Sequence, residues 1–326
     1  MVDFRNFVGR ETPFQGHSLP TMKKQLSYPC LAKFQQFVEL KDYRPRTKET
    51  YFHYVRKLAE HFQCDPSTLS QDQLREYFLF LRQHKKFGGS SMHLARASLR
   101  SFFRECLKLG TDWTVFEEVQ IRRPEPLPFV LGCEEVAAVL RAVREPRFRA
   151  VLRLIYHCGL RVGEAVRIEV GHIDSAGGRI HIRFAKGGRD RYVPIAPPML
   201  EELRAWWKQH RHPRFLFPSP GRGWADRSES LSQTMGRASE PMSVSSVQMA
   251  FRLARAASGV KAQSTVHTLR HSYATHMLEQ GASLRSLSAY LGHQSLDTTA
   301  IYLHLTAVSE AKTQAALAAL HRAVTK

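Results

Sequence analysis

The first third of the chain carries hydrophobic residues at helical spacing, every three or four positions. Four such stripes fall within residues 26–118. They comprise Leu31, Phe34 and Val38; Tyr51, Tyr54, Val55, Leu58, Ala59 and Phe62; Leu74, Tyr77, Phe78 and Leu81; and Ala95, Leu99, Phe102, Phe103 and Cys106. Short turns between them predict a small helical bundle. Residues 1–25 lack this period and are predicted to form a flexible N-terminal arm.

A proline-rich stretch follows the bundle. Residues 119–131 read VQIRRPEPLPFVL, and the closely spaced prolines stop a helix and favour extended chain. Arg122 and Arg123 within it would suit a segment that lies along a phosphate backbone. We therefore predict a linker over residues 119–131 and a second domain over residues 132–326.

The second domain opens with two more helical stripes, and then the period changes. Their members are Val136, Val139, Leu140 and Val143, and Phe148, Val151, Leu152 and Ile155. Ile180, Ile182 and Phe184 then alternate, as do Tyr192 and Pro194 on the return, with Gly187 and Gly188 between the two runs. This pattern predicts a β-hairpin with Lys186 at its tip. The predicted fold class is mainly α with a small antiparallel β-sheet.

Two later stretches are less regular. Residues 218–243 are rich in Gly, Ser, Pro and Arg, which predicts a flexible or partner-dependent loop. Residues 307–326 are alanine-rich and predict a C-terminal helix with small apolar contacts. Such a helix could dock on its own domain or on a neighbouring protomer.

The charge of the chain is a statement about its partners. Its 326 residues carry a formal net charge of +19, which favours nucleic acid as the partner and an anionic membrane as the second choice. No apolar run approaches the roughly 20 residues that span a bilayer, and the N-terminus has no hydrophobic signal core. We therefore expect a cytoplasmic protein that does not enter a membrane.

Cysteine and histidine usage gives little sign of metal chemistry. The five cysteines form no C-x-x-C pair, so we expect reduced thiols that fill core space. His267 and His271 have the spacing of helical metal ligands, but no glutamate of an H-E-x-x-H motif lies between them. We expect no metal and no cofactor.

His267 and Arg270 lie near the start of a predicted helix whose buried stripe is Leu269, Tyr273 and Met277. Ser264 or Thr265 could cap this helix. Unpaired amides and the helix dipole make such a terminus a good phosphate site beside these two side chains. A helix from Ser283 to Leu291, ended by Gly292, and a last short helix that carries Tyr302, capped by Ser295 or Asp297, would converge on the same volume.

These residues resemble the catalytic boxes of the tyrosine recombinases, the phage-integrase family. The boxes read HTLR, LGH and IYLH, and Tyr302 follows His293 by nine residues. GLRVGEA resembles the first arginine box of the family, with Arg161 and, three positions on, Glu164. The resemblance covers roughly residues 26–310, and the chain is similar in length to the Xer-like members of the family.

The resemblance implies a site-specific recombinase that cleaves and rejoins DNA through a 3′-phosphotyrosine, in the integration, excision or resolution of DNA elements. Tyr302 would be the nucleophile, with Arg161, Arg270 and His293 donating to the phosphate. His267 would accept a proton near the tyrosine or donate a further hydrogen bond, and Lys186 would be the general acid. The bundle would be a SAM-like core-binding domain. The expected assembly is a homotetramer on synapsed double-stranded DNA, and an accessory recombinase or a DNA-bending protein is a candidate partner.

Plainer roles stay open for the same residues. Arg161 could only end a helix and pair with Glu164, Lys186 could be a solvated turn residue, and Tyr302 could be a core residue, with Tyr290 close by. Basic residues that could touch DNA or only face solvent are Arg44, Arg46, Lys48, Lys85, Lys86, Arg96, Arg100, Arg122 and Arg123. A non-cleaving accessory DNA-binding protein of the same fold and a tyrosine-type topoisomerase remain alternative functions.

Overall fold

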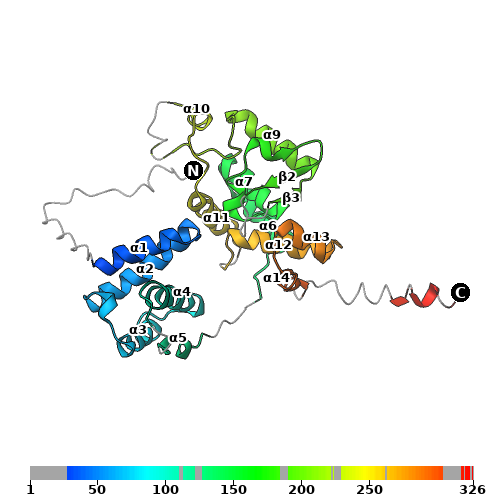
Figure 1. Cartoon of the computed structure of the whole chain (residues 1–326). Helices are drawn as coiled ribbons and strands as arrows, with labels where there is room; N and C mark the ends of the chain where they lie inside the picture. Colours follow the sequence, from blue (N-terminus) through cyan, green and yellow to red (C-terminus); the bar gives the residue numbers. More distant parts are fainter. Residues whose placement is uncertain are drawn as a thin grey trace. The chain divides into compact units, whose positions relative to one another are not determined.

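The computed structural model describes residues 28–109, 113–121, 127–183, 190–221, 223, 229–260, 263–303, 317–318, 320–323 and 325. The chain divides into two compact units, Met1–Glu125 and Pro126–Lys326 (Figure 1). Each unit has a hydrophobic core of its own. The predicted N-terminal arm, residues 1–25, lies outside the described residues.

The first unit contains the four helices that the hydrophobic stripes predict. They are α1 (Pro29–Leu40), α2 (Pro45–Phe62), α3 (Gln71–Gln83) and α4 (Gly89–Arg100), and α4 continues as a π-helical turn over Ser101–Cys106. A 3-10 turn (Pro66–Thr68) and the short α5 (Val115–Glu118) complete the described part of the unit. The bundle prediction is therefore confirmed.

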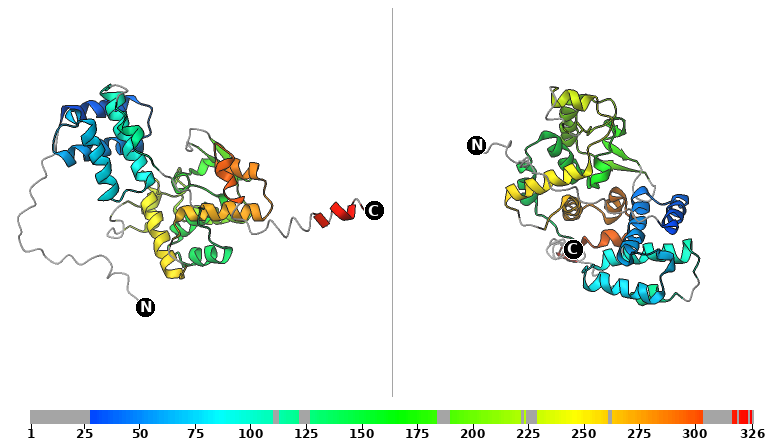
Figure 2. Two further views of the ribbon diagram at one scale, coloured as in Figure 1. Left: turned by 90° about the horizontal axis from the view of Figure 1, so that it is seen from below. Right: turned by 90° about the vertical axis from the view of Figure 1, so that its left-hand side faces the viewer.

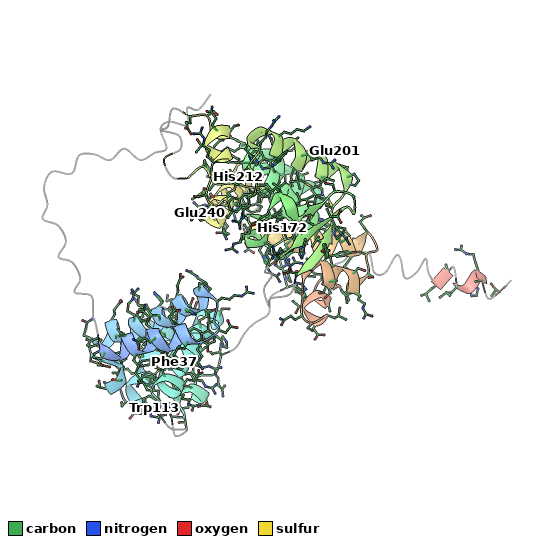
Figure 3. The ribbon with its side chains drawn as sticks, turned by 45° about the horizontal axis from the view of Figure 1, so that its top comes forward. Phe37, Trp113, His172, Glu201, His212 and Glu240 are labelled. Atoms are coloured by element: carbon green, nitrogen blue, oxygen red, sulfur yellow. The ribbon has the colours of Figure 1, made fainter. Side chains whose placement is uncertain are left out.

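Local sequence explains where these helices start. A proline occupies the first turn of α1 and of α2, where no amide partner is lost. Ser70 caps α3 in a reciprocal capping box with Gln73. The helices bury an aromatic core in which the rings of Phe34 and Phe102 meet edge to face at 5.2 Å. Trp113 packs against this core from the α5 side (Figure 3).

The second unit is built from helices around a main hydrophobic core, beside which Tyr273, Leu287, Leu291 and Tyr302 belong to a smaller cluster. These are α6 (Cys133–Ala142), α7 (Pro146–Cys158), α8 (Val162–Ala165), a 3-10 turn (Val170–His172), α9 (Pro197–His210), α10 (Leu231–Gly236), α11 (Val244–Ser258), α12 (Val266–Glu279), α13 (Leu284–Leu291) and α14 (Asp297–Ala300). Helix α12 contacts α7, α11 and α13, an arrangement that can be followed from two further directions in Figure 2. Helix α12 therefore links the segments that carry the predicted catalytic boxes.

A three-stranded antiparallel sheet lies in the same unit. Its order is β1 (Ile173–Asp174), β2 (Arg179–Ile182), β3 (Arg191–Pro194), and Ile182 pairs with Arg191. The two strands of the predicted hairpin are confirmed, whereas β1 was not predicted. Tyr192 and Pro194, the alternating residues predicted for the second strand, are exposed, because Val193 between them is the residue of β3 that enters the core.

The prediction of a flexible or partner-dependent loop over residues 218–243 is wrong for Leu231–Gly236, which form helix α10. Helix α10 forms there because Ser230 caps it through Gln233, and Met235 and Met242 enter the core. His212 holds the segment from outside the helix, with its Nε2 2.8 Å from the carbonyl oxygen of Ala238. Within the predicted loop, residues 222 and 224–228 lie outside the described part of the chain.

The expectation for the cysteines is only partly correct. All five are free thiols; Cys30, Cys106 and Cys158 are buried, but Cys64 is half-buried and Cys133 is exposed at the start of α6. Among the described residues no helix is long and apolar enough to cross a membrane. Most of the predicted C-terminal helix lies outside the described residues, and Leu317 and Leu320 within it are exposed.

Candidate active site

Arg161 lies at the junction between α7 and α8. Helix α7 ends at Gly159, whose φ of 61° is left-handed, and an added Cβ there would lie 2.4 Å from the Tyr273 ring. Arg161 then occupies the N-cap of α8. Glu164 accepts hydrogen bonds from the Arg161 amide at 2.9 Å and from its guanidinium at 2.8 Å. The pairing of Arg161 with Glu164 that the sequence suggested is therefore present.

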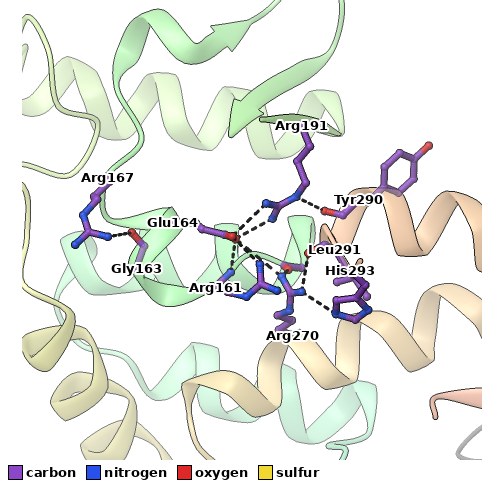
Figure 4. Close-up of polar contacts among 10 residues, drawn as sticks. Arg161, Gly163, Glu164, Arg167, Arg191, Arg270, Tyr290, Leu291 and His293 are labelled. Carbon is purple, nitrogen blue, oxygen red and sulfur yellow. Dashed lines mark hydrogen bonds and ion pairs between the residues drawn. The ribbon is translucent and has the colours of Figure 1, made fainter. Parts of the chain in front are cut away.

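Glu164 is shared with a second arginine. Arg191 on β3 donates to both carboxylate oxygens of Glu164, at 3.1 and 2.8 Å, and its Nε donates to the carbonyl of Tyr290 at 2.7 Å (Figure 4). Both side chains are about nine-tenths buried, at 8% exposure each. Burial alone would raise the pKa of Glu164, but the hydrogen bonds from Arg191 and Arg161 outweigh it and hold the pKa at about 2.

Arg270 is the most enclosed cation of this cluster, with 1% of its surface exposed. Its guanidinium donates to the carbonyl of Gly159 at 2.8 Å and to the carbonyl of Leu291 at 2.7 Å. These two carbonyls belong to the C-terminal ends of α7 and α13, where backbone acceptors lack helical partners. Burial and the nearby Arg161 lower the Arg270 pKa to about 10, which leaves it a cation at neutral pH.

The geometry determines the tautomer of His293. Arg270 lies 3.1 Å from its Nε2 and can only donate, so Nε2 accepts. The proton then sits on Nδ1, which donates to Oγ1 of the buried Thr299 at 2.8 Å. Burial, followed by the charge of Arg270, lowers the His293 pKa to about 4. Both ring nitrogens of His293 are therefore occupied by protein partners, and the predicted hydrogen bond to a phosphate requires the release of one of them.

Tyr302 is buried, with 2% of its surface exposed. It lies in the turn after α14, not in the helix, because α14 ends at Ala300; the expectation of a helix that carries Tyr302 is wrong by this margin. Burial raises its pKa, and the charges of Arg270 and Arg161 oppose that rise. Its hydroxyl lies 2.8 Å from Nδ1 of His271.

His267 lies beside this pair but is exposed at the first turn of α12. Its ring meets that of His271 at 4.5 Å in a T-shaped contact. The protein around its ring, followed by the charge of Arg270, lowers its pKa. The histidine in hydrogen-bond contact with Tyr302 is thus His271, whereas the sequence predicted His267 either as a proton acceptor near the tyrosine or as a further hydrogen-bond donor.

Two residues of the cluster, His271 and Arg191, were not predicted to belong to it, although the sequence carried a signal for each. His271 follows His267 by four positions, which places both on one helix face. Arg191 shares a strand face with Val193, so a buried arginine could have been expected there. Lys186, the predicted hairpin lysine, lies outside the described residues, as does the whole segment 184–189.

The candidate DNA-contacting residues of the bundle differ in their surroundings. Lys85 and Lys86 are exposed directly after α3, and Arg100 is exposed at the end of α4. Arg96 instead donates to the carbonyls of Phe116 at 3.4 Å and Val119 at 3.0 Å, which ties α4 to α5 and its C-cap. Arg96 therefore has partners within the bundle, and its predicted contact with DNA stays a prediction.

At the start of α2, Arg44 is the exposed N-cap residue. Arg46 pairs with Glu49 at 3.2 Å and Lys48 with Glu39 at 2.7 Å. The Arg46–Glu49 pair is exposed and worth about 1 kcal/mol or less, so a phosphate could replace its carboxylate at small cost. Lys48 is more enclosed, with 20% of its side chain exposed. Arg122 and Arg123 lie outside the described residues.

The cluster suits an anion. Arg161, Arg191 and Arg270 face one carboxylate, Glu164, and the nearby histidines are neutral, so the cations exceed the anions around a buried phenol. Such preorganised donors stabilise a phosphate and the charge that develops on it. Within the described ranges no group of His, Cys, Asp and Glu side chains could hold a metal ion.

Comparison with known proteins places this cluster in a known context. Residues 130–308 match the Phage integrase family, and residues 30–113 match its N-terminal SAM-like domain. An integrase/recombinase of Escherichia coli is 30% identical over 90% of this chain and 94% of its own length. Tyrosine recombinase XerA of Thermococcus kodakarensis is 29% identical over 85% of this chain and 90% of its own length. The structure of a lambda integrase tetramer bound to a Holliday junction shares the fold, with a TM-score of 0.66 and 19% identity over 84% of this chain and 76% of the other.

Proposed function

The chain belongs to the phage integrase family, and from that premise we propose that Tyr302 is the nucleophile with which it breaks and rejoins DNA. The protein is a tyrosine recombinase, an enzyme of site-specific recombination. The observation that carries the assignment of Tyr302 is its setting. Its buried hydroxyl lies at the arginine cluster, in contact with His271. Burial raises the pKa of Tyr302, and the charges of Arg270 and Arg161 oppose that rise.

In the proposed reaction, the Tyr302 oxygen attacks phosphorus and forms a 3′-phosphotyrosine. Arg161 and Arg270 stabilise the extra negative charge of the transition state. Removal of one such donor costs roughly 3–4 kcal/mol in comparable sites. Lys186 protonates the leaving 5′-oxygen, and His267, exposed at the rim of the cluster beside His271, takes up the phenolic proton of Tyr302 as the oxygen attacks. A 5′-hydroxyl then attacks the phosphotyrosine, which reseals the strand and restores the phenol.

Two arginines must release or share contacts that they already make for this role. Arg161 is held by Glu164, and two donors of Arg270 are held by helix-end carbonyls. For Arg161 this is possible because Glu164 also binds Arg191, so Arg161 can turn one of its N–H groups toward a phosphate while the carboxylate stays paired. Glu164 is therefore proposed as a supporting residue that orients Arg161.

The proposed partner is double-stranded DNA that carries a recombination site. The net charge of +19 supports it, as does the lambda integrase tetramer bound to a Holliday junction, whose fold the chain shares. We propose that four copies assemble on two synapsed duplexes, with the bundle of residues 26–118 and the catalytic domain of residues 132–326 joined by the linker of residues 119–131. The cytoplasm is the proposed location.

A covalent trapping experiment tests the nucleophile. The protein is incubated with nicked duplex fragments from its own genomic neighbourhood in the presence of a chelator, and a denaturant-resistant protein–DNA adduct is sought. The parent and Tyr290→Phe should form the adduct, and Tyr302→Phe should not, with DNA binding retained. An adduct that persists in Tyr302→Phe would move the nucleophile elsewhere. Binding without any adduct would favour the non-cleaving accessory protein, and sequence-independent relaxation of supercoils would favour the topoisomerase.

A further inference from the structure

One histidine that the proposed reaction does not use touches its reacting atom. Nδ1 of His271 on α12 lies 2.8 Å from the hydroxyl oxygen of Tyr302, with the two rings 5.7 Å apart. The two residues are 31 positions apart in the sequence, so the contact joins the helix of Arg270 to the turn after α14. His271 itself is half-buried between them.

We propose that His271 positions the nucleophile: its neutral imidazole accepts the hydrogen of the Tyr302 hydroxyl and fixes the oxygen for attack on the phosphate. This inference rests on the proposed role of Tyr302. It gives the contact with the tyrosine to His271, and leaves His267 at the exposed rim.

The direction of this hydrogen bond follows from the surroundings. Burial, followed by the neighbouring His267 and Arg270, lowers the His271 pKa to about 4, so its imidazole is neutral at pH 7. Burial raises the pKa of Tyr302, so the phenol keeps its proton. A neutral imidazole with its proton on Nε2 accepts at Nδ1, and the hydroxyl donates.

The same surroundings argue for positioning over proton removal. An imidazole with so low a pKa is a weak base, and a phenol of raised pKa is a weak acid, so proton transfer between them is unfavourable before DNA binds. What the contact supplies is orientation. With its hydrogen committed to Nδ1, the oxygen turns its lone pairs away from His271. Since α14 has only four residues, the backbone alone constrains Tyr302 weakly.

The chain offers two informative substitutions and a matched control. His271→Ala removes the acceptor, whereas His271→Asn keeps an amide oxygen near the place of Nδ1 and cannot take up a proton. On the same helix, Nδ1 of His276 lies 2.9 Å from the hydroxyl of Tyr156, a pair of the same chemistry away from the arginine cluster. His276→Ala therefore controls for the loss of a buried histidine–tyrosine hydrogen bond.

The measurement is the single-turnover rate of adduct formation on nicked DNA at saturating protein, together with DNA affinity and thermal stability for each variant. We expect His271→Ala to cleave roughly 30- to 100-fold more slowly with unchanged DNA affinity, because a small misplacement of a reacting atom can cost about 10²-fold. His271→Asn should stay within about 5-fold of the parent, and His276→Ala should cleave like the parent.

Three results would overturn the proposal: His271→Ala within about 3-fold of the parent, His271→Asn as slow as His271→Ala, or His276→Ala as slow as either. If His271→Ala proves unstable, the His271→Asn rate decides. Tyr302→Phe is run alongside, because an adduct in that variant would refute the nucleophile assignment itself, whatever the rates of the histidine variants.

Discussion

Replacement of Glu164 by glutamine should destabilise the second unit. Glu164 is the one carboxylate that the described contacts place between Arg161 and Arg191, and Arg270 lies 3.9 Å from it. Glu164→Gln keeps the size of the side chain but removes the charge. Three arginines are then left around a neutral amide whose NH₂ group faces their donors.

The magnitude can be worked in two ways. A tenfold change in proton affinity is worth about 1.4 kcal/mol, so the difference between the ordinary pKa of 4.5 and about 2 corresponds to about 3 kcal/mol. Independently, removal of one partner from a buried ion pair costs about 3–5 kcal/mol. Both routes give a loss of about 3 kcal/mol in unfolding free energy, or about 6–12 °C in the melting temperature of a unit of this size.

This loss is measured by urea unfolding and thermal melting of the full-length protein, from the transition in which the second unit unfolds. Glu202→Gln is the control, because its ion pair with Arg153 is far more exposed than that of Glu164, at 36% and 42% against 8%, and should contribute about 1 kcal/mol or less. The folded pKa of Glu164 is lowered, so its stabilisation is present above pH 4.5 and is lost as the pH falls toward 2. The difference in unfolding free energy between the parent and Glu164→Gln should therefore become smaller between pH 4.5 and pH 2. The reasoning would be refuted if Glu164→Gln lost no more stability than Glu202→Gln at pH 7, or if this difference did not change with pH.

Three further outcomes follow from the same structure. Gly159→Ala should lower the unfolding free energy by well over 2 kcal/mol, measured by thermal unfolding, because the added Cβ would collide with the Tyr273 ring. Gly259→Ala is the control: it also has a positive φ but lies in open space, so the loss should be only about 1 kcal/mol. His210 is buried with its pKa lowered to about 4, so unfolding free energy should fall by up to about 1.4 kcal/mol per pH unit from pH 6.5 to 4, and His210→Asn should remove that part of the slope in denaturant titrations. Lys85→Ala with Lys86→Ala should lower the slope of log affinity against log salt by about 2 in DNA binding, if each contacts one phosphate; an unchanged slope would place both outside the interface.

Local pattern was sufficient for much of the fold. Each helix of the bundle has its stripe, its proline or its capping residue within a few positions, and Arg161 with Glu164 forms a local pair across three residues. The helix at Leu231–Gly236 was missed because Gly, Ser and Pro outnumber the apolar residues over residues 229–243, while two buried methionines decide the packing. Composition does not show which few side chains enter a core.

The assembly of the site was beyond local pattern. Arg270 joins carbonyls 111 and 21 residues away, and His271 joins a tyrosine 31 residues away. No period in the sequence encodes these pairs. The motif identifies which residues matter through resemblance, but their partners follow only from the fold.

The ends of two helices explain why Arg270 sits where it does. Helices α7 and α13 both stop at a left-handed glycine, Gly159 and Gly292, and each leaves backbone carbonyls without helical partners. Arg270 satisfies one carbonyl of each, so its charge is held by two helix ends whose partial negative charge stabilises a cation. Arg270→Lys should therefore lower both the melting temperature and the yield of covalent adduct, although it keeps the positive charge. A single ammonium cannot reach both carbonyls in the plane that the guanidinium uses. If Arg270→Lys melted and formed the covalent adduct like the parent, the bridging role would be excluded.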